Sequence, residues 1–69
     1  MKATFAEDIV ISLRKRIGGR VTGKRRFRCG ENCFVEFLGE DNDVTTVDLA
    51  FEDGMLATQI PRHVVQLEK

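Results

Sequence analysis

The segment Val44–Ile60, VTTVDLAFEDGMLATQI, constrains the fold of this chain more than any other stretch. It contains two runs of alternating side chains joined by Asp53-Gly54, a dipeptide that tolerates the positive φ angles of a type I′ turn. The sequence therefore predicts a β-hairpin with the cross-strand pairs Phe51–Leu56, Leu49–Thr58 and Val47–Ile60. One face of this hairpin is then nearly all apolar and the other mostly polar, which is typical of a sheet that covers a core.

Alternation continues through much of the remaining chain and predicts strands at about residues 20–29, 33–38, 44–52, 55–60 and 64–68. The links between them are short and rich in Gly, Asn and Asp, which favours an antiparallel meander because parallel crossovers need longer connections. Pro61 cannot donate to a ladder and ends the fourth strand. Arg62 and His63 are expected to form a tight turn before the fifth.

Residues 4–17 have the pattern of an amphipathic helix. Thr4-x-x-Glu7 matches a capping box, and Gly18-Gly19 supplies a left-handed stop. Apolar side chains recur between them at spacings of three and four residues: Phe5, Ala6, Ile9, Val10, Leu13 and Ile17. The sequence thus predicts an α+β fold in a single domain, residues 1–69: an N-terminal helix followed by a five-stranded antiparallel meander. This arrangement suggests a small SH3-like barrel, although the sequence leaves the closure of the sheet open.

The predicted hairpins all place their apolar side chains on the same interior face of the sheet. Phe27 is expected opposite Val35, and Val35 opposite Val47, all facing the core. The other face would carry an apolar strip, which the helix could cover, made of Phe34, Leu38 and Val44. On that face Arg26 is expected opposite Glu36, and Arg28 beside Phe34 with Asp48 one strand further, so that part of the basic segment pairs with part of the acidic one across the sheet.

Charge is strongly segregated along the chain although the formal net charge is zero. The segment Arg14–Arg28 contains no acid, whereas Cys29–Ile60 contains eight acids and no Lys or Arg. The candidate binding residues are therefore the eight basic side chains of the first segment: Arg14, Lys15, Arg16, Arg20, Lys24, Arg25, Arg26 and Arg28. Such asymmetry can mark a surface for a partner, or two segments that neutralise each other.

A chain of 69 residues has little room for a substrate cleft, so we expect no enzyme, no catalytic residues and no cofactor. The start of the chain lacks the apolar run of a signal peptide and no segment is long enough to span a membrane, so a cytoplasmic location is expected. The favoured hypothesis is a non-enzymatic protein-interaction or regulatory module, capable of self-association. The alternative is a nucleic-acid-binding module that uses Arg14–Arg28.

Metal sites are not expected from this sequence. Cys29, Cys33 and His63 provide three soft ligands, one fewer than a structural zinc site normally takes. The cysteines are interpreted as small core residues, since a disulfide is disfavoured in the cytoplasm. The loop Gly39–Asp43 lacks the ligand alternation of an EF-hand and is interpreted as a polar hairpin loop.

One partial resemblance involves the basic segment. The residues that carry it are Arg25-Arg26-x-Arg28, followed by Val47-Asp48-Leu49-Ala50 and Gly54-Met55-Leu56. This pattern resembles the PilZ family of cyclic-dinucleotide receptors. The arginines are more closely spaced than in that family, Ala50 stands in place of a serine, and the interval from Asp48 to Gly54 is one residue longer. The resemblance implies a small-molecule sensor as a third possibility, and these departures are the reason that no binding site is carried over.

Overall fold

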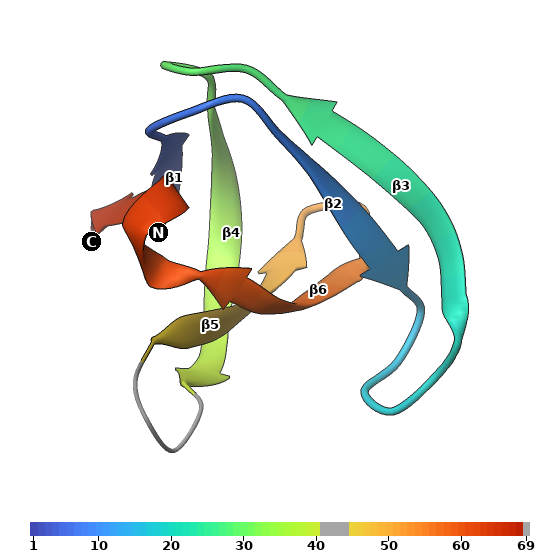
Figure 1. Ribbon diagram of the computed structural model, residues 1–69. Coiled ribbons are helices and arrows are strands. Elements are labelled where there is room, and N and C mark those ends of the chain that lie inside the picture. The colour runs from blue at the N-terminus through green and yellow to red at the C-terminus, as the bar shows by residue number, and fades with distance from the viewer. Residues whose placement is uncertain (41–44, 69) are drawn as a thin grey trace.

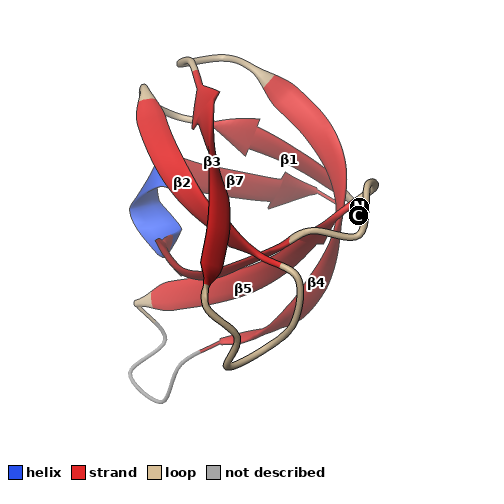
Figure 2. Ribbon diagram, turned by 90° about the vertical axis from the view of Figure 1, so that its right-hand side faces the viewer, coloured by secondary structure: helices blue, strands red, loops and turns tan. Residues whose placement is uncertain are grey.

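The chain folds as one strongly curved antiparallel sheet (Figure 1). The computed structural model describes residues 1–40 and 45–68. Its elements are β1 (Lys2–Phe5), β2 (Ile9–Arg14), β3 (Val21–Phe27), β4 (Asn32–Glu40), β5 (Thr46–Phe51), β6 (Leu56–Pro61), the 3-10 turn η1 (Arg62–Val64) and β7 (Val65–Glu68). The seven strands lie in the order β3-β2-β6-β5-β4-β1-β7. Figure 2 shows how the sheet wraps around its interior. The strand order leaves β3 and β7 as its two edges.

The predicted α+β fold with an N-terminal helix is wrong, because the described residues are all-β apart from the single turn η1. The predicted helix, residues 4–17, is instead the end of β1, a bend, the whole of β2 and the start of the loop that follows β2. Ile9, Val10 and Ile11 are consecutive β-branched residues, which prefer extended backbone. Burial in β2 follows a period of two, with Ile11 and Leu13 buried and Val10 exposed. The sheet is also not closed into the suggested barrel.

The predicted capping box does not form because the backbone of this region bonds to distant parts of the chain. The Phe5 N–H donates to the carbonyl of Glu31, and the Ala6 N–H donates to the carbonyl of Val64, both at 2.9 Å. These bonds, together with the pairing of β1 with both β4 and β7, place the N-terminal strand inside the sheet. Long-range pairing therefore overrides the helical signal.

The order of the strands also differs from the predicted meander. The strand β3 pairs with β2, not with β4, so Phe27 lies opposite Ile9 and Arg26 lies opposite Val10. The strand β4 lies between β5 and β1. The expected pairs Phe27–Val35 and Arg26–Glu36 are therefore wrong, even though Phe27 and Val35 both face the interior as predicted. The expected pair Val35–Val47 is also wrong, because Val35 lies opposite Phe51.

The hairpin at Asp53-Gly54 is confirmed, with a different register near its turn. Gly54 has φ +86°, its N–H donates to the Phe51 carbonyl, and Phe51 pairs with Met55 around a three-residue loop. Further along, Leu49 faces Ala57, whereas Val47 faces Ile60 as predicted, because a bulge intervenes. The pairs Phe51–Leu56 and Leu49–Thr58 are consequently off by one residue.

The bulge is associated with a polar contact between β5 and β6. The Asp48 carboxylate accepts a hydrogen bond of 2.9 Å from the Gln59 N–H, and Gln59 has the left-handed φ of +58°. The C-terminal part of the fold agrees with expectation, since Pro61 is the last residue of β6 and a single turn leads into β7. The sequence also predicts that Leu38 faces Val44 across the loop between β4 and β5, and Val44 lies outside the described residues.

The core is dominated by a stack of three phenyl rings from strands that are distant in the sequence. The Phe5 and Phe27 ring centroids are 4.1 Å apart, and those of Phe27 and Phe51 are 5.6 Å apart, with nearly parallel planes. Leu49 and Val47 are fully buried in the same core. The stack joins β1, β3 and β5, so it fixes the edge strand β3 against the rest of the sheet.

We predict that Phe27→Ala destabilises the domain by about 3–5 kcal/mol, the usual cost of removing a buried phenyl group. A domain of this size has stability of similar magnitude, so the variant should be largely unfolded at 37 °C. Urea unfolding followed by circular dichroism measures the change. Phe34→Ala is the matched control because Phe34 is 61% exposed, and it should cost less than about 0.5 kcal/mol. Equal losses in both variants would contradict the assigned burial.

Candidate functional site

The β2–β3 hairpin has one apolar side and one charged side. Pairing of Val10 with Arg26 and of Ser12 with Lys24 puts these four side chains on the face that points away from the core. Ile11 and Phe27 are buried on the opposite side of their strands. Because side chains two residues apart on a strand share a face, Lys24 and Arg26 stand side by side about 6.7 Å apart along the strand.

A surface hollow lies beyond Arg26, at the end of the hairpin nearest β1. It has a volume of about 410 Å³ and is lined by Arg26, Arg28, Val10, Ile9 and Asp8. The Asp8 carboxylate accepts a hydrogen bond of 2.8 Å from the Cys29 N–H. The two arginines thus line the same hollow together with a carboxylate that is already engaged with the backbone.

The opposite end of the hairpin carries a second cluster of cations in the loop between β2 and β3. A hollow of about 320 Å³ there is lined by Lys15, Arg16, Gly19, Arg20 and Thr22. Gly18 has φ +76°, and a Cβ on Gly19 would lie 3.0 Å from the Arg16 side chain, so the two glycines permit this tight loop. The glycines predicted to end a helix instead shape this loop.

Arg14 and Arg25 have structural contacts that set them apart from the other candidates. The Arg14 guanidinium donates to the Gly19 carbonyl and so holds the loop. Arg25 forms an ion pair with Asp53 and lies with its guanidinium carbon 5.2 Å from the centre of the Phe51 ring. Arg25 therefore ties β3 to the turn between β5 and β6.

The remaining six candidates form what we call the cationic hairpin surface: Lys15, Arg16, Arg20, Lys24, Arg26 and Arg28. Within residues 1–40 and 45–68 the ion pairs are Arg25–Asp53 and Arg62–Glu40, so none of the six has a carboxylate at salt-bridge distance there. All six are exposed. The expected neutralisation of Arg26 by Glu36 does not occur, because three strands separate β3 from β4 in the sheet.

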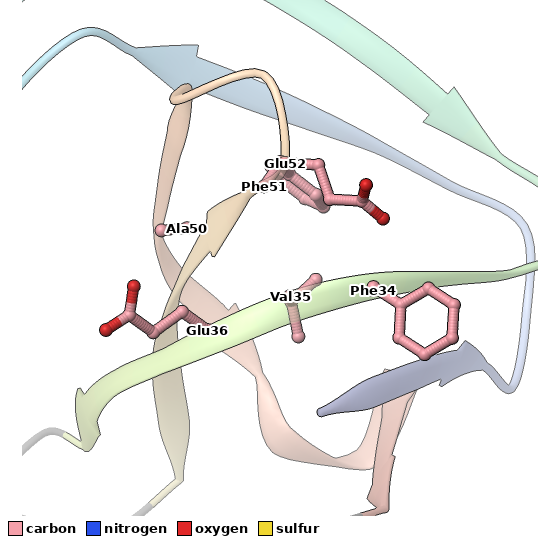
Figure 3. Close-up of a pocket in the computed structure, with 6 residues that line it drawn as sticks. All are labelled: Phe34, Val35, Glu36, Ala50, Phe51 and Glu52. Carbon is pink, nitrogen blue, oxygen red and sulfur yellow. The ribbon is translucent and has the colours of Figure 1, made fainter.

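A second exposed feature is a groove on β4 and β5, which we call the acidic groove. Figure 3 shows its lining, and its volume is about 300 Å³. It is lined by Phe34, Val35, Glu36, Ala50, Phe51 and Glu52. Phe34 and Leu38 are both exposed and no described element is a helix that could cover them, so the predicted apolar strip lacks its predicted cover. Val44, the third member, lies outside the described residues.

The cysteines are not the buried pair that the sequence suggested. Both thiols are free; Cys29 is exposed, with its sulfur 3.2 Å from the Ala6 carbonyl oxygen, and Cys33 is half-buried. Burial raises the pKa of the Cys33 thiol, against a smaller opposing effect of Arg25. Over the described ranges, no group of three His, Cys, Asp or Glu side chains is placed to hold a metal ion.

Comparisons with known proteins give no relative for this chain: no family, no curated protein and no solved structure matches it. Among the residues that the structure describes, no helix has the length and apolar character needed to cross a membrane. Functional inference therefore depends on the side-chain chemistry of the two surfaces.

We predict that Asp53 makes the stability of the domain depend on pH. The Met55 N–H and then the Arg25 guanidinium stabilise the carboxylate and hold its pKa below the usual value. A lowered carboxyl pKa contributes stability above the ordinary pKa of aspartate, and that contribution disappears as the pH falls through the lowered value. Asp53→Asn should therefore be less stable than the wild-type protein at neutral pH.

The difference between wild type and Asp53→Asn should shrink on acidification, as measured by urea unfolding at neutral and acidic pH. Glu52→Gln removes a neighbouring charge that forms no ion pair within residues 1–40 and 45–68, so this control should remain close to wild type at neutral pH. A stability difference for Asp53→Asn that is independent of pH would contradict the role given to the ion pair.

Proposed function

We propose that this domain binds nucleic acid through the phosphate backbone, with the cationic hairpin surface as the contact. The observation that carries the proposal is that six cations project from one hairpin without a carboxylate partner in the described residues. The acids that make the net charge zero belong mainly to β4, β5 and the turns beside them. A neutral total thus coexists with a strongly basic region, and it is the local charge that attracts a polyanion.

The arrangement of the cations suits a chain of phosphates. Lys24 and Arg26 repeat along one strand, Arg28 continues the series at one end, and Arg20 lies at the other end with the loop cluster. Arginine offers a planar fork of donors that can bind a phosphate with two hydrogen bonds. An extended row of such groups supports contact with several successive phosphates.

The β2–β3 hairpin, which the structure describes in full, lacks an exposed aromatic side chain that could stack on bases. Phe27, the aromatic residue within the basic run, is 3% exposed and stacked in the core. Stacking platforms of exposed aromatic rings are the usual means by which strands hold unpaired bases. We therefore propose binding that depends on the backbone and not on sequence, with strong dependence on salt.

A non-enzymatic protein-interaction module is the second candidate function. The acidic groove supports it, because Phe34 is widely exposed on a sheet face that no other described element covers. Exposed apolar area bordered by charges is typical of protein contacts. The two candidates use different surfaces, so they can be tested separately.

We predict that Lys24→Gln/Arg26→Gln weakens binding to a fluorescent single-stranded oligonucleotide of mixed sequence and lowers its salt dependence. Removing two phosphate interactions should reduce the slope of log K against log salt by about 1.4, roughly 0.7 for each. Fluorescence anisotropy across a salt series measures both quantities. The matched control, Lys2→Gln/Arg62→Gln, removes the same charge outside the hairpin and should retain most of the slope. Absence of binding by the wild-type protein at low salt, or equal effects of the two variants, would contradict the proposal.

A further inference from the structure

We propose that the acidic groove of one molecule binds the cationic hairpin surface of a second copy of the same chain, head to tail. This interaction goes beyond nucleic-acid binding. It rests on the second candidate function, a protein-interaction module that uses the acidic groove, and it names the partner as a second copy of the chain. Three features support it: the chemistry of the side chains on the two surfaces, their spacing, and the positions of the two surfaces in the sheet.

The groove presents two carboxylates and an exposed ring in a compact pattern. Glu36 lies opposite Ala50 and Val35 opposite Phe51. Glu52 follows the end of β5, and the same register continued by one residue places it opposite Phe34. The two carboxylates therefore belong to diagonal neighbours, about 7–8 Å apart at the backbone. Neither has an ion-pair partner in the described residues, and Figure 3 shows their carboxylate groups pointing in opposite directions from the groove. Lys2, which pairs with Phe34 from β1, is a cation that borders this pattern.

The outer face of the β2–β3 hairpin has the complementary pattern. Lys24 and Arg26 lie about 6.7 Å apart along the strand, close to the separation of the backbone positions of Glu36 and Glu52. Val10, opposite Arg26, is 53% exposed and supplies an apolar contact for Phe34. Two ion pairs around an apolar contact would exclude water from the ring while neutralising two charges on each molecule.

The two surfaces do not pair with each other within one molecule, because none of Lys24, Arg26, Glu36 and Glu52 forms an ion pair in the described residues. The strands β2, β6 and β5 lie between β3 and β4 in the sheet order, and Lys24 and Arg26 are on the face of β3 that points away from the core (Figure 1). A second copy brings the same complementary charges without altering the fold. Because the two contacting patches differ, the association is heterologous and would extend into a ring or an open chain.

The experiment uses two charge-reversed variants of the full chain and their mixture. Glu36→Lys/Glu52→Lys makes both surfaces positive, and Lys24→Glu/Arg26→Glu makes the paired positions on both surfaces negative. Sedimentation velocity at low salt over a concentration series should show association of the wild-type protein. Each variant alone should associate more than about tenfold more weakly, because like charges then face each other.

The mixture of the two variants is the decisive arm. Each molecule then offers a surface complementary to one on the other variant, so association should return on mixing and should weaken as salt is raised. Phe34→Ala should also weaken association while leaving the unfolding curve near wild type. A wild-type protein that stays monomeric at its highest attainable concentration, or a mixture that stays monomeric, would overturn the proposal.

Oligonucleotide binding separates this inference from the proposed function. Glu36→Lys/Glu52→Lys leaves the cationic hairpin surface intact, so it should lose self-association and retain binding to the mixed-sequence oligonucleotide. Since both interactions need Lys24 and Arg26, added oligonucleotide should also dissociate the wild-type assemblies. Assemblies that persist at saturating oligonucleotide would contradict the shared surface.

Discussion

The stack of Phe5, Phe27 and Phe51 is the interaction on which the arrangement of this domain depends. The ladder between β2 and β6 consists of the pair Arg14–Leu56, so backbone pairing alone holds the β2–β3 hairpin weakly to the sheet. The stacked rings attach β3 to β1 and β5, and Arg25 adds a contact with the Phe51 ring and an ion pair with Asp53. Hydrophobic burial and one arginine therefore determine where the hairpin lies.

The position of the hairpin determines the charge distribution. If β3 paired with β4, Arg26 would meet Glu36 and the basic and acidic segments would cancel across the sheet. Pairing with β2 instead places Val10 and Ser12 beside the cations, and leaves the carboxylates of β4 and β5 on a separate surface. The same molecule thus has a basic surface and an acidic one, and both proposals about its function follow from that separation.

The sequence was informative about the interior and misleading about how the strands pair. Alternation correctly placed Phe27, Val35, Val47 and Phe51 inside, and Asp53-Gly54 correctly marked a turn. The period of two in Ile9–Arg14 was obscured because Ile9, Val10 and Leu13 also fit a helical stripe, and Thr4 and Glu7 resembled a cap. The strand that pairs with β3 could not be predicted from the neighbouring sequence. It depends on the burial of Phe27 between rings from β1 and β5, which are contacts between residues far apart in the chain. The basic candidates were identified from charge alone, but their separation from the acids of β4 and β5 depends on the pairing of β3 with β2.

The pairing of β3 with β2, which inserts Phe27 between Phe5 and Phe51, is tested most directly by nuclear Overhauser effects. In a uniformly labelled sample, we expect cross-peaks between the Phe27 ring and both neighbouring rings, together with backbone cross-peaks between β3 and β2. Cross-peaks that connect Phe27 with Val35 and Arg26 with Glu36, in place of these, would contradict the arrangement described.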